Sequence, residues 1–178
     1  MAAPTQELRF CPRCADALEW RSPHYAEVLH PVCVSCGFTL WQNPKPCVDA
    51  LIIRGVGLTT EVLLGRRAQG PGSGQWDTPG NFLNVGDRLE AALVRECRRE
   101  MGVEVEVESL LGAYEGPFGE ADSITLVYVC RLKSGVPHPA EIIDEVGWFS
   151  VAATPEIAFQ PIRDAVNDLR LRLSGSHP

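Results

Sequence analysis

Residues 79–103 read PGNFLNVGDRLEAALVRECRREMGV, a loop rich in Gly and Asn that runs into a predicted helix. At about 100° per residue, Glu96 and Glu100 lie one turn apart beside the apolar stripe of that helix. Two carboxylates at this spacing repel each other, and their burial is costly unless a cation meets them. Helix geometry alone leaves two interpretations open. Either a divalent metal ion lies between the glutamates, or Glu96 pairs with Arg99 while Glu100 faces solvent.

The loop and helix together resemble the Nudix box, the signature of enzymes that cleave nucleoside diphosphates linked to another moiety. The family pattern is Gly, five residues, Glu, seven residues, and then Arg-Glu-apolar-any-Glu-Glu-any-Gly-apolar. This chain keeps the spacing without insertion and departs from the pattern at Asn81, Asp87 and Arg99. Asn81 replaces a glycine and tolerates a left-handed backbone better than most residues. Asp87 keeps the acidic charge, and we expect it to form a capping box with Glu90.

The resemblance implies roles for the residues of the box. Glu96 and Glu100 are expected to bind a catalytic Mg²⁺ or Mn²⁺, with the Gly80 carbonyl as a further ligand. Arg95 is expected to support the box by pairing with Asp87. Many members of the family use another glutamate, beyond the box, as base or extra ligand, and the candidates here are Glu115, Glu120, Glu141 and Glu145. We favour Glu141 as this catalytic residue, and a solvated loop acid is the alternative interpretation.

Arg99 places a fixed positive charge where the family usually has an acid. It either points at the metal cluster, where it would remove a ligand and contact a substrate phosphate, or it points to solvent. Helix angles favour the solvent side, shared with Arg88 and Arg95. Trp76 and Phe118 are further substrate-binding candidates because they could stack on a base, although a Trp before a Pro-Gly turn more often packs the loop.

A second motif consists of paired cysteines near the N-terminus. Two C-x2-C pairs are separated by eighteen residues: Cys11, Cys14, Cys33 and Cys36. Four thiolates in this arrangement close a tetrahedral zinc site with no open position, so the site should be structural. The alternative is four unconnected cysteines or two short disulfides. Gly37 after the second pair has the backbone freedom that such a turn needs, and Ala15 after the first pair is less suited.

These motifs divide the chain into a zinc ribbon over residues 8–41, a linker over 42–46 and a Nudix domain over 47–173. The linker reads QNPKP, and its prolines cannot easily continue a strand or a helix. It resembles the link between ribbon and Nudix domain in the branch that includes NADH, FAD and ADP-ribose pyrophosphatases. Apolar patterning predicts strands over 47–53, 61–66, 103–107, 124–132 and 145–149 and a helix over 162–173. The predicted fold class is an α/β/α sandwich with a mixed sheet.

Composition narrows the function classes. The chain has 178 residues, 45% of them apolar, and a net charge of −7, which argues against a broad nucleic-acid surface. No apolar run reaches membrane-spanning length, and the first ten residues do not resemble a secretory signal. The seven cysteines then favour a reducing compartment, and we expect a cytoplasmic protein. The resemblance also allows a homodimer.

Two hypotheses of function follow from the resemblance. The first is a Mg²⁺- or Mn²⁺-dependent pyrophosphohydrolase acting on ADP-ribose, FAD or a similar nucleotide. Residues 112–123, GAYEGPFGEADS, lack the Ser-Gln-Pro-Trp-Pro-Phe-Pro stretch of NADH pyrophosphatases, and the position of Pro117 resembles ADP-ribose enzymes. The alternative is a Nudix-derived binding or regulatory module with weak or no hydrolysis, because Arg99 replaces a box glutamate.

Overall fold

The structure, a computed structural model, describes residues 9–23, 28–41, 43–118 and 121–175, with the side chains of residues 118 and 121 excluded. The chain forms two compact units, Met1–Pro44 and Lys45–Pro178. The division falls inside the segment 42–46. No helix among the described residues is long and apolar enough to cross a membrane.

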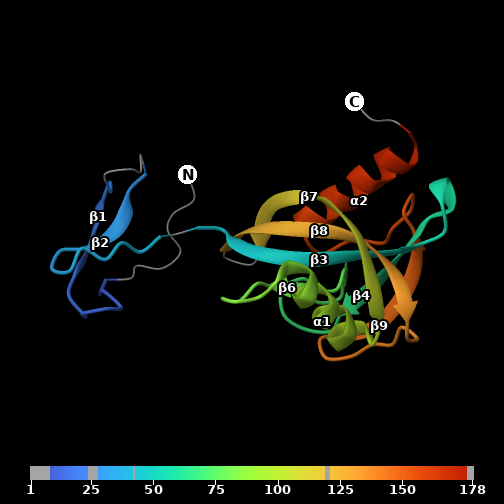
Figure 1. Cartoon of the computed structure of the whole chain (residues 1–178), viewed down its shortest axis with the longest axis horizontal. Helices are drawn as coiled ribbons and strands as arrows, with labels where there is room; N and C mark the ends of the chain where they lie inside the picture. The colour runs from blue at the N-terminus through green and yellow to red at the C-terminus, as the bar shows by residue number, and fades with distance from the viewer. Residues whose placement is uncertain (1–8, 24–27, 42, 119–120, 176–178) are drawn as a thin grey trace. The chain divides into compact units, whose positions relative to one another are not determined.

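The first unit is a small two-stranded sheet (Figure 1). Its strands, β1 (Leu18–Arg21) and β2 (His30–Cys33), pair antiparallel. The turns that follow the two cysteine pairs both use a left-handed residue, Ala15 at φ 63° and Gly37 at φ 70°. The sequence anticipated this requirement at both turns, and Ala15 meets it at a steric cost that glycine would not have.

The second unit is built on a mixed sheet of seven strands. Its central strands are β3 (Lys45–Arg54) and β8 (Ala121–Ser134), which run parallel, and β7 (Glu104–Phe118) pairs antiparallel with β8. On the other side of β3 lies β4 (Glu61–Arg67), which follows the short helix η1 (Gly57–Thr59) and pairs antiparallel with β9 (Ile143–Ser150). Two short strands, β5 (Trp76–Asp77) and β6 (Gly80–Phe82), pair with β4 and β3.

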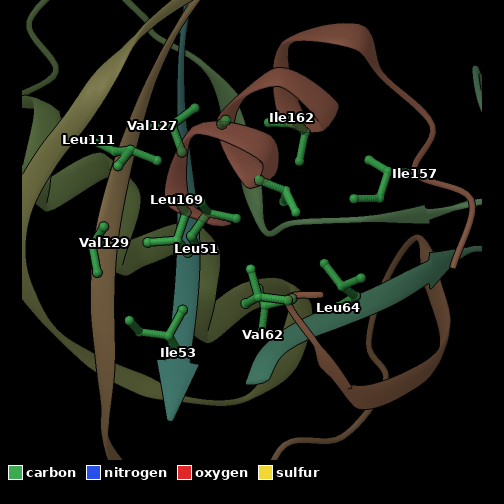
Figure 2. Close-up of a cluster of buried hydrophobic side chains, with 13 residues drawn as sticks. Leu51, Ile53, Val62, Leu64, Leu111, Val127, Val129, Ile157, Ile162 and Leu169 are labelled. Carbon is green, nitrogen blue, oxygen red and sulfur yellow. The ribbon is translucent and has the colours of Figure 1, made fainter. Parts of the chain in front are cut away.

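Two helices cover the two faces of this sheet (Figure 1). On one face, α2 (Gln160–Leu173) packs Ile162, Val166 and Leu169 onto Leu51 and Val127 (Figure 2). On the other face, α1 (Leu89–Met101) packs Leu93, Cys97 and Met101 against residues of β3 and β8 that include Ile52 and Cys130. The predicted α/β/α sandwich with a mixed sheet is confirmed. The apolar run of β8 is continuous because both of its faces are buried.

The start of α1 differs from the expectation. The residue preceding the helix is Arg88, and no side chain in this described segment caps it. The Asp87 carboxylate instead accepts hydrogen bonds from Arg95 and from the Asn84 backbone N–H, so it is not available as a cap. Asn81 lies in β6 and does not have a positive φ, so the left-handed backbone considered for it is not needed.

The end of α1 carries the loop that precedes β9. Gly102 ends the helix at φ 65°, a left-handed conformation that glycine adopts without steric cost. The His138 backbone N–H donates to the Met101 carbonyl at 3.1 Å, and the Ala140 N–H donates to the Glu100 carbonyl at 3.2 Å. These bonds hold Glu141, the next residue, beside the helix. Glu141 itself has a left-handed backbone at φ 53°, which is uncommon outside glycine.

We expect Gly102→Ala to destabilise the protein strongly. A Cβ at position 102 would lie 1.9 Å from the His138 ring, in addition to the strain of a positive φ. The free energy of unfolding, measured with denaturant, should fall by more than about 2 kcal/mol. Gly74→Ala is the matched control, because Gly74 has φ 83° and its added Cβ would meet no described atom within 4 Å. That control should lose only about 1 kcal/mol. An equal loss in the two variants would contradict the proposed clash, and His138→Ala should restore part of the Gly102→Ala loss.

Candidate active site

Glu96 and Glu100 are buried in the core-facing side of α1. Their relative exposures are 2% and 3%, although both are acids. The helix places them there because they flank Leu93, Cys97 and Met101, which pack onto the sheet. Solvent exposure of Glu100, one of the open interpretations, is therefore wrong. Since buried carboxylates are costly without a partner, the site needs a cation.

Arg99 supplies a cation from the same helix. Its Nε donates to Glu96 Oε2 at 2.7 Å, and its Nη2 donates to Glu100 Oε1 at 3.1 Å. Its Nη1 donates to Glu141 Oε2. The side chain is about one-third exposed and lies in the carboxylate cluster, so the solvent orientation that helix angles favour is not the one observed. The Glu96–Arg99 ion pair is present, and it extends to two further acids.

Arg95 makes the contact that the sequence predicted. Its guanidinium binds both oxygens of Asp87, at 3.1 and 3.3 Å, and its Nε donates to Glu96 Oε1 at 3.1 Å. The Arg95 guanidinium lowers the pKa of Asp87 below its usual value. Arg95 thus links the loop before α1 to one of the buried glutamates. Asn81 approaches the same carboxylate from β6, with Nδ2 at 3.4 Å from Glu96 Oε2.

A second group of buried charges lies beside the box and was missed by the sequence reasoning. Asp77 pairs with Arg67 at 2.9 Å, and both side chains are at most one-tenth exposed. Asp49 accepts a hydrogen bond from the Thr78 hydroxyl at 3.0 Å. The available signal was Asp49 itself, an acid in the middle of the apolar run of a central strand. Gly80 pairs with Asp49 across β3 and β6, and a Cβ at Gly80 would lie 2.3 Å from Asp49 Oδ1.

Burial raises the pKa values of three of these acids, Glu100, Asp77 and Asp49. Burial raises the pKa of Glu100 to about 7, Arg99 opposes that rise, and Asp77 and Glu96 add to it. Burial likewise raises the pKa of Asp77 to about 6 against the pull of Arg67. Burial and the neighbouring Asp77 raise the pKa of Asp49 well above its usual value. Each of these acids would gain from an additional positive charge nearby.

The cluster opens onto a cavity of about 220 Å³ within the second unit. Asp49, Asp77, Arg67, Arg99 and Glu100 form its charged part. Its other walls are mainly apolar, with a few small polar groups, and comprise Cys47, Phe82, Pro117, Ser123, Thr125, Ile142, Phe159, Pro161 and Ile162, together with backbone-exposing Gly80 and Asn81. A wall that combines charged groups with apolar side chains suits a ligand that is itself part anionic and part flat and apolar.

The two aromatic candidates for substrate binding have different outcomes. Trp76 is not among the described residues that line the cavity, and its ring packs edge-on against Phe149 at 4.6 Å, which is the packing role. The side chain of Phe118 lies outside the described residues. Phe82 and Phe159 line the cavity instead, and the sequence reasoning did not select them. Phe82 occupies a position of the box that the family pattern leaves unspecified, and Phe159 is brought to the site only by the folded chain.

The four N-terminal cysteines converge. Their Sγ atoms all lie within 4.8 Å of one another, and three of the pairs are 3.4, 3.6 and 3.7 Å apart. Disulfides are excluded because an S–S bond is only about 2.05 Å long. A tetrahedral zinc ion with Zn–S bonds of about 2.3 Å places its sulfurs about 3.8 Å apart, so these residues fit a metal ion. The backbone N–H of Cys36 lowers the pKa of Cys33 to about 6, which favours the thiolate.

The donors of the buried acidic cluster fit a divalent cation in type but not in arrangement. The cluster contains six carboxylates and three guanidinium groups. The acids are Asp49, Asp77, Asp87, Glu96, Glu100 and Glu141, and the bases are Arg67, Arg95 and Arg99. The excess of acids favours one added divalent ion. Among the described residues, however, only the four cysteines form a group of three or more ligands arranged to hold a metal ion. Arg99 lies between the glutamates that the resemblance assigns to the metal.

The comparisons with known proteins agree with this geometry. Residues 43–169, well over half of the chain, match the family model described as NUDIX domain. The chain belongs to the Nudix hydrolase family.

Curated relatives include enzymes with two kinds of substrate in their names. A NAD-capped RNA hydrolase NudC of Deinococcus radiodurans is 34% identical over 151 residues, which cover 80% of this chain and 52% of the relative. An ADP-ribose pyrophosphatase of Methanocaldococcus jannaschii is 29% identical over 124 residues, 68% of this chain and 71% of the relative. The chain thus spans about half the length of this NudC relative.

Solved structures share the fold. A NUDIX hydrolase from Nitrosomonas europaea superposes with a TM-score of 0.76 at 24% identity, over 96% of this chain and 93% of that one. The NUDIX domain of Shewanella oneidensis NrtR, solved with ADP ribose, gives a TM-score of 0.60 at 21% identity, over 75% and 90% of the two chains.

Removal of the second cysteine pair should abolish metal binding by the first unit. We expect the double substitution Cys33→Ser and Cys36→Ser to lower the zinc content, measured by elemental analysis, from about one per chain to near zero. Because so short a unit has little core, it should also lose its fold, while the second unit keeps its own unfolding transition. Cys47→Ser, outside the cluster, is the control and should retain zinc. Zinc retained by the double variant would contradict the assignment.

Glu100 should make stability depend on pH. Its pKa rises from 4.5 in the unfolded chain to about 7 in the folded protein, so the folded protein keeps a proton that the unfolded chain releases. Stability from this group is therefore lost as pH rises through that window. In buffers without divalent ions, the free energy of unfolding of Glu100→Gln relative to wild type should increase by up to about 3 kcal/mol between pH 4.5 and 8.

Glu104→Gln is the control for this measurement. Arg98 lowers the pKa of the exposed Glu104, so that substitution should change stability by a constant amount over the same window. A constant difference for Glu100→Gln as well would show that Glu100 does not titrate there.

Proposed function

We propose that this protein is a divalent-metal-dependent pyrophosphohydrolase that cleaves the diphosphate of a nucleoside diphosphate linked to another moiety. The observation that carries the proposal is the position of Glu96 and Glu100. They are buried acids of the Nudix-box helix, and Glu100 lines a cavity whose wall is partly charged and partly apolar. A diphosphate joined to a flat base would suit both parts of this wall.

Mg²⁺ or Mn²⁺ would neutralise the diphosphate and lower the pKa of an attacking water. Glu96, Glu100 and the Gly80 carbonyl are the proposed residues that hold it. Arg95 positions Glu96 through the Asp87 pair, and Arg99 offers positive charge to the phosphates from the cavity wall. The acids alone would repel a diphosphate. The bound metal ion and the arginines would hold positive charge in fixed places and so offset that repulsion.

Glu141 is the proposed base or extra ligand. It lies next to Ile142, a residue of the cavity wall, and the loop bonds to the end of α1 hold it near Glu100. Its carboxylate binds Arg99, and about half of its side chain is exposed to solvent. A base must come within hydrogen-bond reach of the water it activates, and we propose that Glu141 does so when substrate is bound.

The apolar and aromatic part of the cavity wall is proposed to select the substrate. Phe82 and Phe159 offer aromatic faces, and Ser123 and Thr125 offer hydroxyl groups, which together suit a heterocyclic base. ADP-ribose and FAD are the favoured substrates, supported by the relative named ADP-ribose pyrophosphatase. Because another relative is named NAD-capped RNA hydrolase, NADH and a NAD-capped RNA belong in the test. The absence of nucleic-acid binding, the homodimer and the cytoplasmic location stay predictions.

The first unit is proposed to hold a structural zinc ion. Its four thiols use every position of a tetrahedral site, so none is open to a substrate.

A binding or regulatory module is the second candidate function. Arg99 favours it, because its guanidinium already binds an oxygen of Glu96, Glu100 and Glu141, the acids assigned to catalysis. Such a module would keep the cavity and its affinity for a nucleotide while hydrolysing it slowly or not at all.

A hydrolysis screen separates the two candidates. Wild type, Glu100→Gln and Arg99→Glu are incubated with ADP-ribose, FAD, NADH, nucleoside triphosphates and a NAD-capped RNA, with and without Mg²⁺ or Mn²⁺. For the enzyme, kcat/KM on at least one substrate should fall by about 100-fold or more in Glu100→Gln. Glu90→Gln is the control, because Glu90 lies exposed on the same helix, and it should keep near wild-type activity.

The opposite pattern would favour the binding module. In that case wild type would turn over none of these compounds although it binds one of them in calorimetry, and Arg99→Glu would gain activity.

A further inference from the structure

The Arg99 guanidinium is surrounded by three carboxylates, as a metal ion is surrounded by its ligands. Its guanidinium reaches Glu96 through Nε and Nη2, Glu100 through Nη2 and Glu141 through Nη1. These contacts use donors on all three nitrogens of the fork. They also join acids from two separate elements, helix α1 and the loop before β9. Arg99 is therefore the single described group that connects all three carboxylates.

The spacing of the oxygens matches a guanidinium better than a metal ion. Oxygens that share one Mg²⁺ lie within about 4.2 Å of one another, since each is about 2.1 Å from the ion. Among the described residues, the carboxylates form no group of three or more that could hold a metal ion in this way, whereas the four cysteines do. A planar guanidinium about as wide as a carboxylate holds its acceptors further apart than an ion does. The glutamates here are thus arranged around an organic cation.

The charges lead to the same conclusion. Glu96 and Glu100 have side chains at most 4% exposed, so each is costly to keep ionised unless a cation lies beside it. Arg99 provides that neighbour permanently, from a position where the family pattern has an acid that would instead require more metal. The presence of Arg99 in place of an acid therefore removes one metal ligand. It also adds a positive charge that replaces part of the charge of the lost metal ion.

We propose that Arg99 takes the place of one divalent cation between Glu96, Glu100 and Glu141, so that this chain binds one divalent ion fewer than a box with an acid at position 99. The proposal rests on the proposed metal-dependent function and concerns how many ions that function uses. Its consequence is that a negative charge at position 99 creates a metal site that the wild-type chain lacks.

Counting bound Mn²⁺ tests this directly. Free Mn²⁺ is measured by electron paramagnetic resonance during titration of the full, zinc-loaded chain. Arg99→Glu should bind about one Mn²⁺ more per chain than wild type. Arg98→Glu is the matched control, because it makes the same change of charge one residue away. Arg98 pairs with the exposed Glu104 outside the cluster, so this variant should bind no more than wild type. Equal Mn²⁺ binding by the two variants would overturn the proposal.

Thermal unfolding gives a second measurement that does not depend on turnover. Arg99→Gln leaves the three acids without their cation, so added Mn²⁺ should raise its unfolding temperature by several degrees more than it raises that of Arg98→Gln. A chain that folds only with Mn²⁺ present would support the proposal equally. If both Arg99 variants fail to fold with and without Mn²⁺ while the Arg98 variants fold, the ion cannot replace Arg99 and the proposal fails.

The two proposals fail in different ways. Absence of hydrolysis by wild type would defeat the proposed function but would leave the Mn²⁺ count per chain to decide the role of Arg99.

Discussion

The burial of Glu96 and Glu100 is the constraint on which the site depends. Both lie on the face of α1 that packs against the sheet, where Leu93, Cys97 and Met101 anchor the helix. A carboxylate in that position cannot be solvated by rotating away, because the rest of the face is packed. It must be met by a cation or hold a proton. The raised pKa of Glu100 and the reach of Arg99 to three acids are two responses to the same condition.

The sheet brings charged residues from several strands together with those of the helix in the wall of one cavity. Asp49 lies in a central strand, and Gly80 approaches it so closely that no side chain fits between them. Gly80 belongs to β6, which leads into the loop before α1, so the charged residues of β3 and of the helix come together in the wall of one cavity. The same wall includes Ile162 of α2 and Thr125 of β8. The site therefore depends on the pairing of β3 with β6 and β8 as much as on the box.

The sequence predicted the elements better than the contacts between them. Strand and helix positions follow from periodicity, and the cysteine spacing is local, so both could be read without a structure. The Asp87–Arg95 pair was also predictable, because one motif contains both residues. Asp77, Arg67 and Phe159 were missed because their proximity arises from strand pairing and helix packing far along the chain. The orientation of Arg99 could not be decided from the sequence for a related reason. Helix angles place a Cα, whereas a long flexible side chain follows the charges around it.

Stability alone does not account for this arrangement. Buried ion pairs such as Arg67–Asp77 contribute little more than well-packed apolar residues of similar size would, because the charges lose their water. An apolar core could have continued through Asp49, Asp77, Glu96 and Glu100 at lower cost. Each of these acids instead keeps a place at or beside a cavity, and Glu141 keeps a strained backbone to join them. Charge held in this way is useful only to a ligand that brings charge of its own, and a diphosphate with its metal ion is such a ligand.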